Sequence, residues 1–319
     1  MSPDFPDRPL TPQAGERLDA ATTRRYRLRS GEDPAAEIRR VARGRVDSAL
    51  EQLRRGARAD VATAVQDTRK DLKKLRSLLR LVRGEVGEKR YRGENHRYRD
   101  AARQLSGPRD AEVKLATLAD LRERFPSEAP AAQTLQRALE RDHARIAAEG
   151  DALAERIGSA AEVLAAGRDA IDAWPLKSHG FDLVREGLER AYRRGRDRLG
   201  AVREDPTADA VHDWRKRVKD LWYQLRLLRE AWPAGLEALS DEAHRLADLL
   251  GEHHDLSVLV EAARDEAPDE PDTGTLATLA ERRQAELLDA ALALGGLLYA
   301  ERPRRFTRRI ERYWEAWRA

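Results

Sequence analysis

The sequence predicts an all-α fold, and three observations lead to this prediction. Ala, Leu, Arg and Glu dominate a chain of 319 residues in which 37% of the residues are charged and only 5% are aromatic, a composition typical of long amphipathic helices. Leucines recur at helical spacing in "DLKKLRSLLRLV" (71–82). One helical unit also occurs twice, and a hydrophobic content of 41% is enough for the cores of both copies.

Pro and Gly divide the first half into four predicted helices. The first covers 32–56. The second follows Asp60, a residue suited to cap a helix N-terminus. The third runs through Leu118, and the fourth covers 131–157, directly after a proline.

The second half gives a similar series of predicted helices. The first covers 181–200, and the next begins after "EDPT", with Pro206 near its first turn. A third covers 235–264, an acidic linker "DEAPDEPDTG" follows, and a helix over 275–298 precedes a basic C-terminal helix.

These elements predict four parts of the chain. Residues 1–33 form a flexible N-terminal segment, 34–158 a first helical bundle, 159–179 a connecting segment and 180–319 a second helical bundle. Each bundle has the size of an ordinary small domain and is expected to contain four main helices.

Residues 65–83 and 211–229 are two copies of one motif, 146 positions apart. "VQDTRKDLKKLRSLLRLVR" and "VHDWRKRVKDLWYQLRLLR" share 10 identities in 19 positions. Downstream, "QLSGPRDAEV" (104–113) corresponds to "LLGEHHDLSV" (249–258), with Gly107 and Asp110 near the positions of Gly251 and Asp255. The repeat therefore covers a whole structural unit.

The cations of each motif gather on one face of its predicted helix. The first copy has seven cations and two carboxylates, and the second has six and two. Arg69, Lys73 and Arg76 lie on the side opposite to the leucines. Because like charges at i, i+4 cost about 0.2–0.5 kcal/mol per pair, a face that keeps them in both copies indicates an anionic partner.

A solvated surface is the alternative for either helix taken alone. The matched positions are the cations together with the core leucines, whereas Lys74 corresponds to Asp220. This selective matching favours a shared anion site. Trp214 and Trp222 are interpreted as residues of the core or of a bundle interface.

At this point the motifs resemble a known family. "VHDWRKRVKDLWYQLRLL", with "AYRRGRDRL" before it and "LADLLGEHHDLSVL" after it, resembles the CHAD family, the conserved-histidine α-helical domain. The resemblance covers roughly 34–319. It implies two four-helix bundles of long antiparallel helices, related by a pseudo-twofold axis, around a basic central cavity that binds inorganic polyphosphate. The family's histidine is present as His212, but Gln66 replaces it in the first copy.

Residue by residue, the resemblance implies phosphate contacts in both motif helices: Arg69, Lys70, Lys73, Arg76, Arg80, His212, Arg215, Lys216, Lys219, Tyr223 and Arg226. Neighbouring segments add further candidates: Asn95, Arg99 and Arg103 at i, i+4 and i+8 of one helix, Arg193 and Arg196 on another, and His254 as a residue that orders the cationic site.

Polyphosphate suits a row of cations because it is charged along its whole length and has no base to recognise. Nucleic acid is the alternative ligand, since a basic groove binds any polyanion. The sequence has no string of exposed rings for single strands and no helix-turn-helix or zinc-finger spacing.

No motif predicts catalysis, a metal or a cofactor. The phosphate-cradling loop Gly-x-x-x-x-Gly-Lys and the nucleophile motif Gly-x-Ser-x-Gly are both missing. His253, His254 and Asp255 lack the i, i+4 histidine pair of a helical metal site, because His244 lies nine residues before His253. We therefore expect a binding protein and not an enzyme.

Composition also predicts the compartment. The chain has no cysteine, which fits a reducing environment. Its start lacks the pattern of a signal peptide, and the longest apolar run, 291–300, is too short to span a bilayer. We expect a cytoplasmic protein without a membrane partner. Association with polyphosphate granules and their proteins is implied by the resemblance alone.

Overall fold

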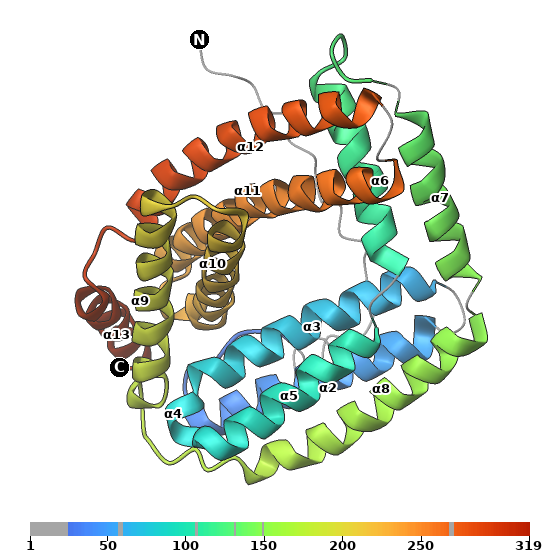
Figure 1. Ribbon diagram of the computed structural model, residues 1–319. Coiled ribbons are helices and arrows are strands. Elements are labelled where there is room, and N and C mark those ends of the chain that lie inside the picture. The colour runs from blue at the N-terminus through green and yellow to red at the C-terminus, as the bar shows by residue number, and fades with distance from the viewer. Residues whose placement is uncertain (1–24, 57–59, 106–107, 131, 149, 268–270) are drawn as a thin grey trace.

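Figure 1 shows a computed structural model, which describes residues 25–56, 60–105, 108–130, 132–148, 150–267 and 271–319. All regular elements within these ranges are helices. The predicted all-α class is therefore confirmed.

Four long helices of the first half lie side by side in Figure 1. They are α2 (Pro34–Gly56), α3 (Val61–Leu81), α5 (Glu88–Gln104) and α8 (Gly150–Ala170). The short helix α4 (Arg83–Val86) joins α3 to α5. Asp60 caps α3 as predicted, because its Oδ1 accepts a hydrogen bond from the backbone N–H of Thr63 at 3.1 Å.

The second half contributes α9 (Asp182–Glu204), α10 (Ala208–Leu228), α11 (Pro233–Glu266), α12 (Pro271–Leu298) and α13 (Pro303–Arg318). Single 3-10 turns, Ile171–Ala173 and Arg229–Ala231, follow α8 and α10. Thr207 caps α10 through its hydroxyl oxygen, which accepts from the N–H of Ala210 at 3.2 Å.

The third and fourth predicted helices of the first half are divided differently. The helix expected to run through Leu118 is two helices, α5 and α6 (Pro108–Arg124). Proline favours the first turn of a helix because it has no N–H to leave unpaired, so Pro108 suits the start of α6. Gly107 and the side chain of Asp110 lie outside what the structure describes.

The range 131–157 contains the end of one helix and the start of another. Helix α7 (Gln133–Ala147) is followed by α8, which continues to Ala170. Residues 159–170, predicted as part of a connecting segment, are therefore helical. The reason is continued helical spacing of apolar side chains, since Ala160 and Leu164 are fully buried in the main core.

Helices α6 and α7 pack on the second half of the chain. Leu118 and Leu121 of α6 and Leu135 of α7 share a core with Leu256 of α11 and Leu276 of α12. In this second core, which is separate from the main one, α6 lies beside α7 and α11 (Figure 1).

Residues 25–33, predicted as part of a flexible segment, pack on helix ends. Leu28 is buried, and its N–H donates to the carbonyl oxygen of Leu227 at 3.2 Å. Arg27 forms an ion pair with Glu230 at 2.8 Å. Residues 1–24 of that segment lie outside the described residues.

The two motif helices meet at the centre of the fold. The hydroxyl of Ser77 donates to the backbone oxygen of Asp220 at 3.1 Å, and the leucines predicted to face the core are buried. Helix α9 approaches the end of α3 at Gly187, where a Cβ atom would lie 1.8 Å from the carbonyl oxygen of Leu81. Only glycine permits this approach.

Candidate functional site

A hollow of about 700 Å³ lies between α3, α6, α10 and α11. We call it the basic hollow. Its lining consists of Arg69, Lys70, Lys73, Lys74, Val113, Lys114, Arg215, Lys219, Trp222, Tyr223, Arg226, His244, Asp248, His254, Asp255 and Val258. Eight of these side chains are lysine or arginine, and two are carboxylates. The lining is therefore strongly cationic.

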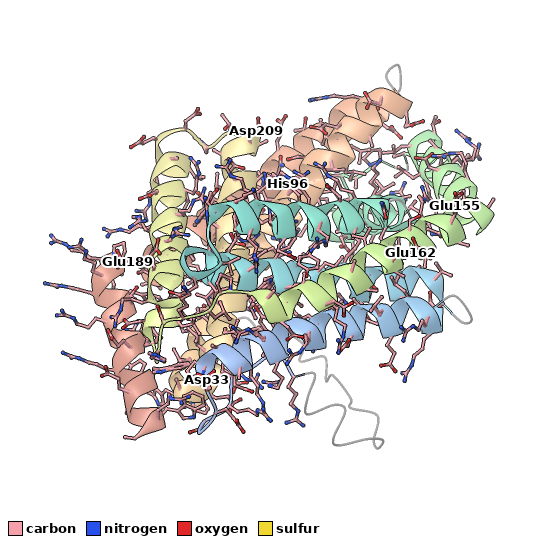
Figure 2. The ribbon with its side chains drawn as sticks, turned by 90° about the horizontal axis from the view of Figure 1, so that it is seen from below. Asp33, His96, Glu155, Glu162, Glu189 and Asp209 are labelled. Atoms are coloured by element: carbon pink, nitrogen blue, oxygen red, sulfur yellow. The ribbon has the colours of Figure 1, made fainter. Side chains whose placement is uncertain are left out.

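The carboxylates of several outer helices lie elsewhere. Figure 2, which views the molecule from below, places Glu155 and Glu162 along α8 and Glu189 on α9. None of the three lines the basic hollow. The near-neutral total of 60 cations and 57 carboxylates thus conceals a local separation of charge.

Equivalent residues of the repeat face one another in the basic hollow. Arg69 and Lys73 come from α3, and Arg215 and Lys219 are their counterparts on α10. Burial, together with the nearby cations of Arg215 and Lys73, lowers the pKa of Lys219 to about 8. Both motif helices therefore contribute to a single cationic surface.

Two further equivalent residues, Lys70 and Lys216, have local partners. Their Nζ atoms lie 2.9 Å from Asp67 and Asp213, each three residues earlier on the same helix. Lys70 lines the basic hollow, whereas Lys216 does not. The acids that the two copies of the motif share thus neutralise part of its charge.

Aromatic side chains form one wall of the basic hollow. The Trp222 ring stacks on His244, with centroids 4.0 Å apart, and on Tyr223 at 4.5 Å. The guanidinium of Arg226 lies 5.5 Å from the centroid of Trp222. Trp214 is fully buried, as predicted, but Trp222 is only partly buried and lines the hollow. Its interpretation as a core or interface residue was incomplete.

His212 is placed next to His254, with ring centroids 4.2 Å apart. Burial lowers the pKa of His212 to about 4, with further contributions from His254 and the cations of Lys216 and Arg215. His254 lines the basic hollow and His212 does not. Near neutral pH, His212 therefore adds no positive charge to the free protein.

The structure brings eight of the predicted binding residues to the basic hollow: Arg69, Lys70, Lys73, Arg215, Lys219, Tyr223, Arg226 and His254. It places nine outside the lining: Arg76, Arg80, Asn95, Arg99, Arg103, Arg193, Arg196, His212 and Lys216.

Most of these nine residues have hydrogen-bond or ion-pair partners away from the basic hollow. Arg76 donates to Asn95 at 3.0 Å, Arg80 pairs with Asp220 at 2.6 Å, and Arg99 and Arg103 lie near Asp100. On α9, Arg193 lies 3.5 Å from Glu189, and Arg196 donates to the backbone oxygen of Glu301. Helices α5 and α9 pack against the C-terminal half of α3. The cations in that half of α3 therefore face these helices and not the basic hollow.

Lys74, Lys114 and His244 also line the basic hollow, although the sequence motifs did not predict them. Lys74 stands one turn after Lys70 and could have been found from that spacing. It was set aside because its counterpart is Asp220. Lys114 and His244 come from α6 and α11, whose positions no motif indicated.

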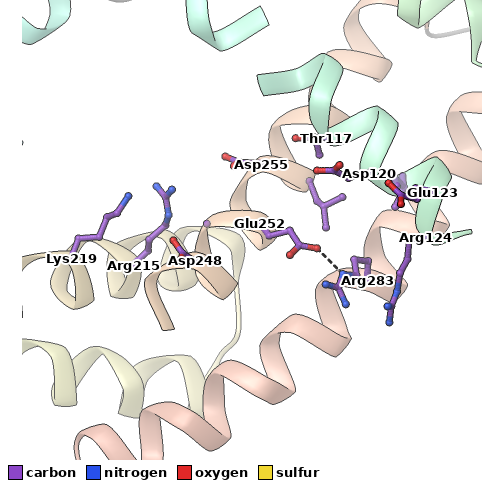
Figure 3. A pocket seen from close by; sticks show the side chains of 13 residues that line it. Thr117, Asp120, Glu123, Arg124, Arg215, Lys219, Asp248, Glu252, Asp255 and Arg283 are labelled. Atoms are coloured by element: carbon purple, nitrogen blue, oxygen red, sulfur yellow. Dashed lines mark hydrogen bonds and ion pairs between the residues drawn. The ribbon is translucent and has the colours of Figure 1, made fainter. Parts of the chain in front are cut away.

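A second hollow of about 750 Å³ continues from the first (Figure 3). The two share Arg215, Lys219, Asp248 and Asp255, four residues that we call the charge boundary. Beyond it, the second hollow adds the carboxylates of Asp120, Glu123 and Glu252.

Both arginines that the second hollow adds are paired with carboxylates. Glu252 is paired with Arg283 at 2.7 Å (Figure 3), and Arg124 is paired with Glu286 at 2.8 Å. Burial raises the pKa of Asp120, and the carboxylates of Glu252 and Glu123 raise it further. The dominant charge therefore changes sign across the charge boundary.

The described residues include neither a metal-ion site nor a membrane-spanning helix. Within the described ranges, no three His, Asp or Glu side chains are arranged as a metal-ion site. None of the helices described here combines the length and the apolar character needed to cross a bilayer.

The pKa of Lys219 predicts how pH affects anion binding. A bound polyanion favours protonated lysine, so the pKa of Lys219 should rise in the complex. Affinity should fall above about pH 8, where the free protein must take up a proton at Lys219 to bind. Titration with polyphosphate at pH 6, 7, 8 and 9 measures this. Lys219→Arg should bind without the fall, and an equal fall in that variant would contradict the assignment.

Most of the chain matches the model of a known protein family. The model of the CHAD domain family matches residues 40–264, more than half of the chain. A search of curated proteins found no significant match. The matched region contains both motif helices and every residue of the charge boundary. The chain therefore belongs to the CHAD family.

Proposed function

We propose that this protein binds inorganic polyphosphate in the basic hollow. One observation supports this most directly: Lys73 and Lys219, equivalent residues of the two copies, line the same hollow and are close enough to lower the pKa of Lys219. Such crowding of cations is unfavourable in the free protein, and a bound polyanion would relieve it.

The lining has the chemistry that a phosphate chain requires. Lysine provides a compact charge with three rotatable donors, and arginine provides a planar fork that matches two phosphate oxygens. Lys70, Lys73, Lys74 and Lys114 provide the first kind of group. Arg69, Arg215 and Arg226 provide the second.

We further propose that two pseudo-twofold-related helical bundles enclose this basic cavity. The support is the repeat itself, since its equivalent residues Arg69 with Arg215 and Lys73 with Lys219 face one space. The first bundle would consist of α2, α3, α5 and α8, and the second would be built on α9 to α12.

Nucleic acid remains the second candidate, because the ring of Trp222 at the basic hollow could offer a base a stacking surface. That ring is already stacked on Tyr223 and His244. Polyphosphate needs no stacking surface, and the cationic lining alone suffices for it.

We propose binding without catalysis. Residence in the cytoplasm at polyphosphate granules, with granule proteins as partners, is the setting that this function suggests.

A competition experiment tests the proposal. Long-chain polyphosphate, short-chain polyphosphate, single-stranded DNA and duplex DNA are titrated at one fixed salt concentration, because salt changes every polyanion affinity. The proposal predicts the tightest binding for polyphosphate. A clear preference for duplex DNA would contradict the proposed function.

A further inference from the structure

A small cavity lies on the other side of α10, away from the basic hollow. Arg217, Asp220 and Gln224 of α10 line it, together with Arg80 at the end of α3 and Arg190 of α9. It shares no residue with the basic hollow. Its volume of about 20 Å³ leaves room for one small ion or a water molecule.

Three buried polar atoms around this cavity have no hydrogen-bond partner among the described residues. They are Nε of Arg80, Nη1 of Arg190 and the side-chain oxygen of Gln224. Gln224 is only 1% exposed. Buried polar groups in folded proteins are nearly always paired, and each unpaired one costs about 1–3 kcal/mol. The three atoms therefore indicate a bound species between them.

The charges around the cavity indicate its sign. Asp220 is the only carboxylate of the lining, and it is shared by Arg80 at 2.6 Å and Arg217 at 3.2 Å. Arg190 pairs with Glu186 outside the cavity. Arg194, an exposed residue that also lines the cavity, forms no ion pair with another described residue. Positive charge is therefore in excess.

The titration of nearby arginines agrees with this excess. Burial lowers the pKa of Arg76 to about 10, with Arg80 as the second cause. Burial also lowers the pKa of Arg194, followed by the effect of Arg217. Arginine stays protonated at neutral pH, so these cations repel one another in the free protein.

We propose that this cavity binds a monatomic inorganic anion, of the class of chloride, between Arg80, Arg190, Arg194 and Gln224. The anion accepts hydrogen bonds from the guanidinium groups and from the amide of Gln224, whose oxygen and nitrogen positions exchange by a 180° rotation. A water molecule would satisfy some of these donors but would leave the positive charge uncompensated.

The position of the cavity gives the anion a structural role. It lies between α3, α9 and α10, beside the close approach of Gly187 to Leu81. An anion here would hold α9 against the crossing of the two motif helices. This inference is independent of the proposed polyphosphate function, because none of its residues lines the basic hollow.

Thermal unfolding at constant ionic strength tests the proposal. Sodium gluconate, whose anion is too large for the cavity, is replaced stepwise by sodium chloride or, in a second series, by sodium phosphate. We expect a saturable rise in Tm, roughly 3 °C or more at tenfold excess over Kd, with chloride. Phosphate is too large for the cavity and should give no rise that Arg194→Gln removes.

Matched variants on α9 locate the effect. Arg194→Gln should lose most of the anion-dependent rise in Tm. Arg198→Gln, one turn later on the same helix, exposed and outside the cavity, should keep it, and so should Lys219→Gln in the basic hollow. Crystals soaked in bromide should show an anomalous peak between Arg190 and Gln224.

The same experiments can overturn the inference. Equal Tm values in gluconate, chloride and phosphate would show that no small anion binds. A rise that is unchanged in Arg194→Gln, or a water molecule at this position in bromide-soaked crystals, would also exclude the site. A failure to bind polyphosphate would contradict only the proposed function.

Discussion

Replacing Lys73 and Lys219 together by glutamine is expected to lower polyphosphate affinity at least about a hundredfold. Each lysine loses a charge-assisted contact worth about 1.5–3 kcal/mol, and about 1.4 kcal/mol corresponds to a factor of ten. The same change should leave Tm of the free protein equal or slightly higher, because Lys73 and Lys219 repel one another across the basic hollow. Calorimetric titration and thermal unfolding give the two values.

The control for this variant is Lys89→Gln with Lys177→Gln, two exposed lysines outside the basic hollow. It removes the same charge and should bind nearly as well as the wild type. Two half-site variants complete the series: Arg69→Ala with Lys73→Ala, and Arg215→Ala with Lys219→Ala. Similar losses in both would support one site. Binding untouched by either pair would mean that the repeat preserves only a fold.

Removing the carboxylate of Asp71 should have the largest effect on stability. Asp71 accepts from Arg45 at 2.8 Å and from Lys74 at 3.3 Å, and the side chains of Asp71 and Arg45 are only 3% and 9% exposed. Asp71→Ala leaves a buried arginine without its carboxylate. This should lower the free energy of unfolding by about 3–5 kcal/mol, as measured by urea denaturation.

Asp67→Ala is the matched control, one turn earlier on α3. Its ion pair with Lys70 is exposed on both sides, so the loss in the free energy of unfolding should stay below about 1 kcal/mol. Its polyphosphate affinity should increase, because Lys70 lines the basic hollow and loses a competing partner. Equal destabilisation by the two variants would contradict the structural role of Asp71.

The sequence predicts the motif helices well because one periodic pattern contains both their core and their charged faces. The buried leucines of α3, the cap at Asp60 and the four matched cations of the basic hollow all follow from it. A single helix could not show which cations belong to a shared site. The repeat at an offset of 146 residues shows that Arg69 corresponds to Arg215, and Lys73 to Lys219.

The remaining features depend on packing between distant segments. Arg80 carries the same charge as Lys73, but it faces α9 and meets Asp220. Nothing in the sequence of α3 specifies where α9 lies. The low pKa of His212 likewise results from burial beside His254. Lys114 enters the basic hollow only because α6 packs on α11 in the second core.

A polyanion in the basic hollow meets the carboxylates of Asp248 and Asp255 at the charge boundary, and those of Asp120 and Glu123 beyond it. Carboxylates repel a polyanion, so we expect the chain to be bound from the side of the basic hollow and not to pass through. The protein should then bind polyphosphate laterally, without the chain passing through it. A copy bound in the middle of a long chain can dissociate directly, without sliding to a free end, and its dissociation rate should therefore not depend on the length of the chain.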